Sequence, residues 1–148
     1  MILIYLLVFR HRFVFFRLSI ENTDLNETVE YVSDIDATFG SLFHNLQKAY
    51  LYESDPLLAC GDRITPPFEM LNTSGIILVV LIKRGNCTFD HKVFLAQEAG
   101  FQGSIVYNNL NNGIFAMSSD DSSTNTVIPS RMVSISDGCL MRRYYTYT

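Results

Sequence analysis

The three cysteines, Cys60, Cys87 and Cys139, are the side chains best suited to chemistry in this 148-residue chain. They form no C-x-x-C pair, so neither the spacing of a zinc site nor that of a thioredoxin-like motif is present. In an oxidising compartment we expect Cys60 and Cys87 to form a disulfide, which would stabilise the fold by about 3.5 kcal/mol. In a reducing cytosol both would be buried thiols, and this alternative stays open. Cys139 is left as an unpaired thiol.

The histidines do not form a metal or catalytic site in the sequence. His11, His44 and His91 are isolated, and none has a second ligand at helical spacing. No G-x-S-x-G elbow, P-loop or G-x-G-x-x-G fingerprint is present either. We therefore predict no catalytic residue, no bound metal and no cofactor for this chain, although a small secreted enzyme whose site is assembled from distant segments remains an alternative.

Three sequons match the acceptor pattern for N-linked glycans. They begin at Asn26, Asn72 and Asn86, and each falls in a segment predicted to be a loop. N-glycosylation requires passage through a lumen, so these matches agree with the oxidising compartment that a disulfide needs.

Composition excludes several classes of function. The chain is 48% hydrophobic with a net charge of -4, and it lacks the basic stripe that nucleic acid would require. No apolar run reaches the ~20 residues that cross a bilayer as a helix. We predict no nucleic-acid partner and contact with a membrane only through segments missing from this chain or through an uncleaved N-terminus.

The first 35 residues are expected to lie outside the folded domain. Residues 1–17 combine a nine-residue apolar run with a basic Arg10-His11-Arg12 that follows it, the reverse of the usual charge order of a cleaved signal. An atypical signal-like or anchor segment is one interpretation, and a buried strand or a fragment of a longer product is the other. Residues 18–35 are polar and acidic, and we expect an exposed connection.

The central elements should position any site in residues 36–148, the expected domain. Ile76–Ile82 is an unbroken apolar run typical of a strand buried on both faces. The apolar period then changes to that of a short helix, with Thr88 or Asp90 as N-cap and Gly100 after its end. Ile105–Tyr107 reads as a second strand. This order predicts a βαβ unit with parallel strands.

The flanking segments are less regular. Apolar residues from Phe39 to Leu46 fit a short helix or an irregular strip facing the core, and Tyr50–Tyr52 fits a short strand. Pro66-Pro67 requires an extended loop, because consecutive prolines remove backbone donors and fix φ.

The polar loop 108–123 is a candidate partner-binding surface. Apolar side chains within a polar loop can anchor a partner peptide. The candidate residues are Asn108, Asn109, Ile114, Phe115 and Met117. The alternative is that Ile114–Met117 forms a short strand of the core.

Several of these stretches together resemble the protease-associated (PA) domain. The resemblance extends from about Asp36 to Ser136 and is closest to the lumenal domain of Goliath-type transmembrane RING-finger E3 ubiquitin ligases. The matching stretches are Asp36–Gly40, Ala59-Cys60, Pro66-Pro67, Ile82–Val93, Ala96–Phe101, Ile105–Asn108 and Ile128–Ser130.

The resemblance implies an α/β (β/β/α) fold, with a curved β-sheet core flanked by short helices around the βαβ unit. It also implies that Cys60 and Cys87 are paired, because they fall where the family's paired cysteines fall. In that family the domain performs no catalysis and recruits protein or peptide partners on the lumenal side. We therefore expect a recognition module in the lumen of the endosome, lysosome or endoplasmic reticulum, or a secreted one.

This sequence departs from the ligases in three respects. It has no transmembrane helix and no RING cysteine pattern, and it stops at Tyr145–Thr148, where the family would continue into a further strand. A truncated product or partial gene model is the expected explanation, and ligase activity is not carried over. The alternative host is a signal-peptide-peptidase-like intramembrane protease or a sorting receptor, since similar motifs occur there.

Overall fold

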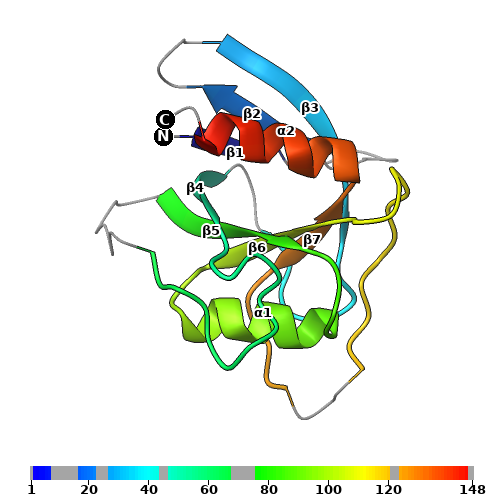
Figure 1. Ribbon diagram of the computed structural model, residues 1–148. Coiled ribbons are helices and arrows are strands. Elements are labelled where there is room, and N and C mark those ends of the chain that lie inside the picture. Colours follow the sequence, from blue (N-terminus) through cyan, green and yellow to red (C-terminus); the bar gives the residue numbers. More distant parts are fainter. Residues whose placement is uncertain are drawn as a thin grey trace.

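A computed structural model describes residues 2–7, 17–22, 27–43, 47–67, 76–120 and 124–146 of the chain (Figure 1). In these residues seven strands and two helices follow one another. The strands are β1 (Ile2–Leu7), β2 (Arg17–Asn22), β3 (Glu27–Asp36), β4 (Gln47–Glu53), β5 (Ile76–Lys83), β6 (Gly103–Tyr107) and β7 (Ser130–Val133), and the helices are α1 (Phe89–Glu98) and α2 (Ile135–Thr146).

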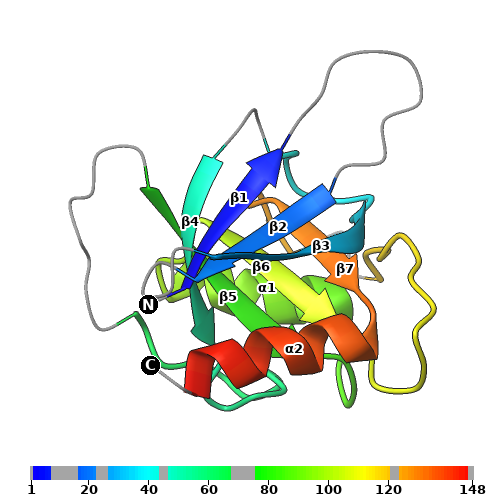
Figure 2. The same cartoon turned by 90° about the horizontal axis from the view of Figure 1, so that it is seen from above.

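The strands form one sheet that closes into a barrel in the order β1-β2-β3-β7-β6-β5-β4. The β4, β5, β6 and β7 strands run parallel to one another, whereas β1, β2 and β3 join the sheet through antiparallel pairs. Curvature of the sheet is visible in Figure 2, where β1, β2 and β3 cross above the parallel strands. The expected α/β fold with a curved sheet and short helices is therefore confirmed.

The predicted βαβ unit is β5-α1-β6, and its two strands are parallel as expected. Residues Leu78 to Ile82 are all buried, which explains the unbroken apolar run. Thr88 is the N-cap residue, although its side chain makes no capping hydrogen bond. Gly100 follows the helix at φ 93°, a conformation that favours glycine.

Alternate residues of the parallel strands face two separate apolar cores. Val79 and Leu81 of β5 face the barrel interior, where Met141 of α2 also packs. Val80 and Ile82 face the other core, under Leu95 and other apolar residues of α1. The helices consequently cover opposite faces of the parallel strands, as Figure 1 shows.

The expected exposed connection over residues 18–35 is wrong for the part that the structure describes. β2 and β3 pair with each other there, and Asp34 to Asp36 pair with β7. Val32 is buried, Ser33 is exposed and Asp34 is buried, which is the two-residue period of a strand with one solvated face. The high polar content of the solvated face concealed this alternation in the sequence.

Two other regions had alternative interpretations in the sequence. Within residues 2–7 the apolar N-terminal segment forms β1, paired with β2 and β4, which agrees with the strand interpretation. Residues 37–43 are irregular, with Phe43 buried and Leu42 exposed, which agrees with the irregular strip facing the core and not with the short helix. The helix α2 was not predicted.

Candidate functional site

A disulfide between Cys60 and Cys87 joins the loop after β4 to the segment before α1. We call this loop, residues 54–67, the proline-bearing loop. The two Cα atoms lie 5.6 Å apart, and both residues are half-buried. His91 of α1 adds a second link between the same two segments, because its Nε2 lies 3.1 Å from the carbonyl oxygen of Gly61. Cys139 is an exposed free thiol on α2.

Beneath the disulfide, Lys92 of α1 is fully buried and bonds to backbone from two loops. Its Nζ donates to the carbonyl oxygens of Leu58 and of Gly85, the latter at 2.8 Å. The same atom lies 3.2 Å from Cys60 Sγ. Burial lowers the pKa of Lys92 to about 8, so the side chain is still mainly an ammonium at neutral pH. The sequence analysis did not identify this residue, because a lysine on a short helix is usually solvated.

Asn108 is buried and organises the start of the loop 108–120. Its Oδ1 accepts hydrogen bonds from Arg84 Nη1 at 2.9 Å and from the backbone N–H of Asn109 at 2.8 Å. Its Nδ2 donates to the carbonyl oxygen of Gly113 at 2.8 Å. The prediction that Asn108 contacts a partner directly was wrong, because its side chain is buried and its hydrogen bonds are made within the protein. Asn109 is half-buried beside it.

Met117 is also unsuited to partner contact, since it is fully buried in the core under α1. Its carbonyl oxygen accepts bonds from the backbone N–H and the hydroxyl of Thr38. The alternative interpretation of residues 114–117 as a strand is wrong too, because the segment is irregular. An irregular loop thus supplies a core side chain, because Thr38 satisfies the backbone carbonyl group of Met117.

Two side chains of α1 bond to the segment that leads from this loop back to β7, which we call the returning arm (Ser119 and residues 124–129). Asp90 Oδ2 accepts hydrogen bonds from Ser119 Oγ at 3.0 Å and Thr124 Oγ1 at 2.9 Å. At the next-to-last residue of the helix, Gln97 Oε1 accepts from the backbone N–H of Val127 at 2.7 Å, and its Nε2 donates to the Asn125 carbonyl oxygen. The helix therefore fixes both ends of the arm.

Phe115 is exposed at 38% of its full surface, and Leu110 of the same loop is exposed at 72%. Its ring meets the edge of Phe89 at a centroid distance of 5.8 Å, and the Arg84 guanidinium lies 5.0 Å from the Phe115 ring. Ile114 is half-buried and packs against the core below. We call Arg84, Phe89 and Phe115 the aromatic platform. The platform adjoins an open concavity of about 420 Å³ that Arg84 and Phe89 also line.

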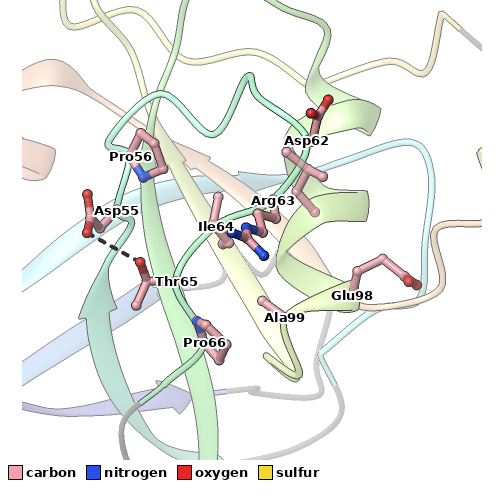
Figure 3. A pocket seen from close by; sticks show the side chains of 10 residues that line it. Asp55, Pro56, Asp62, Arg63, Ile64, Thr65, Pro66, Glu98 and Ala99 are labelled. Atoms are coloured by element: carbon pink, nitrogen blue, oxygen red, sulfur yellow. Dashed lines mark hydrogen bonds between the residues drawn. The ribbon is translucent and has the colours of Figure 1, made fainter.

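A larger groove of about 620 Å³ lies between the proline-bearing loop and the end of α1 (Figure 3). Asp55, Pro56 and Pro66 lie on the loop side and Glu98 on the helix side, and the Arg63 side chain lies between them. Asp55 Oδ2 accepts a hydrogen bond from the Thr65 hydroxyl at 3.3 Å, and the Glu98 carboxylate points away from the groove. The polar groups thus do not converge on one point, as they would in an active site.

The structure also contains a buried charge cluster that the sequence analysis missed. In the barrel, Arg131 of β7 donates to Asp34 Oδ2 and Asp36 Oδ1 of β3, both at 2.7 Å. Burial raises the pKa of Asp34 to about 6, against the lowering effect of the Arg131 guanidinium. Strand alternation in β3 was the available signal, since it places both carboxylates on one face.

Of the three predicted glycan acceptors, Asn86 lies in the described part of the chain, and Asn26 and Asn72 lie outside it. Asn86 is exposed at φ 68° in the turn between β5 and α1, and Thr88 of the same sequon is exposed. Its glycosylation stays a prediction. Among the described residues no group of three potential ligands could hold a metal ion, and none of their helices is long and apolar enough to span a bilayer.

The sequence matches the PA domain family over residues 45–140. The disulfide and the βαβ unit both lie within these residues. The chain belongs to the PA domain family.

Its relatives are longer proteins that are named as E3 ubiquitin-protein ligases or as RING domain-containing proteins. E3 ubiquitin-protein ligase RNF13 of Bos taurus is 35% identical over 117 residues, covering 77% of this chain and 30% of that protein. E3 ubiquitin-protein ligase Godzilla of Drosophila melanogaster is 32% identical over 123 residues, or 82% and 23% of the two chains. Receptor homology region, transmembrane domain- and RING domain-containing protein 3 of Arabidopsis thaliana is 33% identical over 100 residues, or 67% and 23%.

Among solved structures, the zinc aminopeptidase BSAP from Bacillus subtilis contains a similar fold. The superposition gives a TM-score of 0.52 at 19% identity and covers 77% of this chain and 26% of that enzyme. At this identity the likeness supports the fold alone. Our chain spans less than a third of each of these four proteins.

Proposed function

We propose that this chain is a non-catalytic protein-recognition module that faces the lumen of the endomembrane system or the cell exterior. In this proposal it corresponds to the substrate-recruiting domain of a transmembrane RING-type E3 ubiquitin ligase, with the RING outside the present sequence. Support comes from the names of the relatives, which are E3 ubiquitin-protein ligases, and from the disulfide, which persists in oxidising compartments.

The aromatic platform is the observation on which the partner-binding role depends. Phe115 is exposed, yet its position is fixed by Phe89, by Arg84 and by a loop that Asn108 holds from below. An aromatic ring that is already ordered loses little conformational entropy when a partner covers it. We infer that a protein or peptide partner covers Phe115 and enters the adjoining concavity.

A crosslinking experiment tests this role. A photoreactive amino acid replaces Phe115 in the full chain expressed in the secretory pathway, and the matched control carries it at Leu42, which is more exposed, at 55%. We expect position 115 to crosslink to a partner. An excess of unlabelled wild-type chain should abolish these crosslinks by competition, whereas an excess of the Phe115→Ala chain should not. Equal crosslinking from both positions, with the disulfide intact, would contradict the platform as the binding surface.

The host protein is tested separately. In a chimera, this chain is joined through a transmembrane helix to an active RING domain. We expect ubiquitin transfer to the crosslinked partner to fall at least tenfold with Phe115→Ala and to be retained with Leu42→Ala. If neither substitution changes transfer, the domain does not select the substrate.

A further inference from the structure

The buried ammonium group of Lys92 lacks an anionic partner in the described part of the chain. Its Nζ bonds to two carbonyl oxygens and contacts the Cys60 sulfur, and no carboxylate there forms an ion pair with it. A buried charge compensated by dipoles alone is unfavourable, and the side chain is fully buried. The nearest atom that could become an anion is the Cys60 sulfur, at 3.2 Å.

We propose that Cys60–Cys87 is an exchange-competent disulfide that reacts with external thiols, and that Lys92 makes the Cys60 sulfur its leaving group. The site would take a low-molecular-weight dithiol or the thiols of a dithiol protein. This inference goes beyond the recognition function and does not depend on it.

Access to the disulfide is one-sided. Cys87 lines the open concavity of about 420 Å³ next to the aromatic platform, together with Gly85, Asn86 and Thr88, whereas Cys60 is not among its lining residues. In this proposal the incoming thiolate enters the concavity and attacks the Cys87 sulfur. Arg84 and Asp120 both line the concavity, so Arg84 attracts the negative charge of a thiolate and Asp120 opposes this attraction.

The reaction balances as an ordinary thiol–disulfide exchange. The external thiolate forms a bond to Cys87 Sγ, the Cys60–Cys87 bond breaks, and its electron pair remains on Cys60 Sγ as a thiolate beside the Lys92 ammonium. The second thiol of the reductant then displaces Cys87, which takes up a proton. The reductant is oxidised to its disulfide, and the protein disulfide is reduced by two electrons.

Two positive charges determine which cysteine leaves as the thiolate: the N-terminus of α1 favours Cys87, and Lys92 favours Cys60. Cys87 lies immediately before the N-cap Thr88, where the helix dipole acts as roughly half a positive charge and favours a thiolate at Cys87. Lys92 places a whole charge in contact with Cys60, in a buried site where solvent screens it little. The larger and closer charge decides, so Cys60 leaves.

Reduction by dithiothreitol tests the proposal in the full chain made without glycans. Cys139→Ser serves as background, because the exposed Cys139 thiol would otherwise react. We expect Lys92→Met to slow the second-order reduction roughly tenfold at pH 7, since a leaving thiol of higher pKa leaves more slowly. Lys83→Met, which removes a half-buried lysine at the end of β5, should leave the rate unchanged. An unchanged or faster reduction of the Lys92→Met chain would overturn the proposal.

Two measurements on chains that keep Lys92 guard against misfolding of that variant. Glutathione should form its mixed disulfide on Cys87, as mapped by peptide mass, and trapping on Cys60 would overturn the assignment. In a Cys87→Ser, Cys139→Ser chain, the thiolate absorbance of Cys60 should titrate at least one unit below the usual value of about 8.5 for a free cysteine. A Cys60 titration at or above that value would equally reject the role of Lys92.

Discussion

At the residue scale, the buried cluster of Asp34, Asp36 and Arg131 places two carboxylates on one guanidinium. The Asp34 side chain has no exposed surface and that of Arg131 has 2%, whereas the Asp36 side chain is 25% exposed. Burial of Asp34 is the largest cause that raises its pKa; it outweighs the lowering by the Arg131 guanidinium, and the Asp36 carboxylate adds a smaller rise. A proton taken up by Asp34 neutralises this buried carboxylate.

The Asp34 cluster should make the protein more stable at mildly acidic pH. The folded-state pKa of about 6 is above the ordinary value of 3.8, so the folded state binds the proton more tightly. Its stabilising contribution is complete below pH 3.8 and is lost as pH rises through about 6. Between pH 7 and pH 5 we expect about 1 kcal/mol more stability, measured by urea denaturation.

Asp34→Asn should remove this gain, and Asp62→Asn, on an exposed loop, should keep it. Because the other acidic groups titrate alike in all three chains, the difference between the variants isolates Asp34. If the Asp34→Asn chain gains as much stability on acidification as the wild type, the cluster is not the proton acceptor.

At the element scale, α2 approaches the sheet through a glycine. A Cβ atom at Gly138 would lie 2.3 Å from the Cβ of Tyr107 on β6, a distance at which one of the two elements must move. The close contact lets α2 cover the barrel core, into which its Met141 packs.

Gly138→Ala should therefore destabilise the domain. We expect a loss of about 2 kcal/mol from overpacking, measured as the free energy of unfolding in urea. Gly61→Ala is the matched control, because a Cβ there meets no atom within 4 Å. Similar stabilities of the two variants would indicate that α2 shifts on the sheet without cost.

The hydrogen bonds from α1 to the returning arm are a second feature at the element scale. Gln97→Ala removes the acceptor for the Val127 and Ile128 N–H groups. We expect amide hydrogen exchange at these two positions to accelerate at least tenfold, with a loss of global stability of only about 1 kcal/mol. Glu98→Ala, one residue further on the exposed side of the helix, should change neither quantity. Unchanged exchange in the Gln97→Ala chain would mean that other contacts hold the arm.

At the scale of the whole molecule, the disulfide closes a long loop that contains β5. Cys60 and Cys87 are 27 residues apart in sequence, so the bridge restricts a large part of the unfolded chain. Replacing both cysteines with serine should lower the free energy of unfolding by about 3.5 kcal/mol. Cys139→Ser should be close to neutral, because that thiol is exposed. Equal stability of the bridged and unbridged chains would show that Lys92 and the proline-bearing loop suffice without the covalent link.

The sequence by itself determined the βαβ unit, because a buried strand and an amphipathic helix have different apolar periods that act over neighbouring residues. The family resemblance implied the pairing of Cys60 with Cys87, and the sequence placed a polar loop after β6. Gly100 marked the end of the helix, because the backbone conformation that it favours is a property of the residue itself.

Only the tertiary structure decided which residues of that loop face solvent. Asn108 and Met117 look like their exposed neighbours in sequence, but bonds from Arg84 and Thr38, distant along the chain, direct them inward and leave Phe115 on the surface. The burial of Lys92 and Asp34 was likewise not predicted, because a charge becomes buried through what packs over it. Strand alternation in β3 places Asp34 and Asp36 on one face but does not show that this face is covered. Contacts between distant segments set burial, and burial sets both the surface offered to a partner and the pKa of an ionisable group.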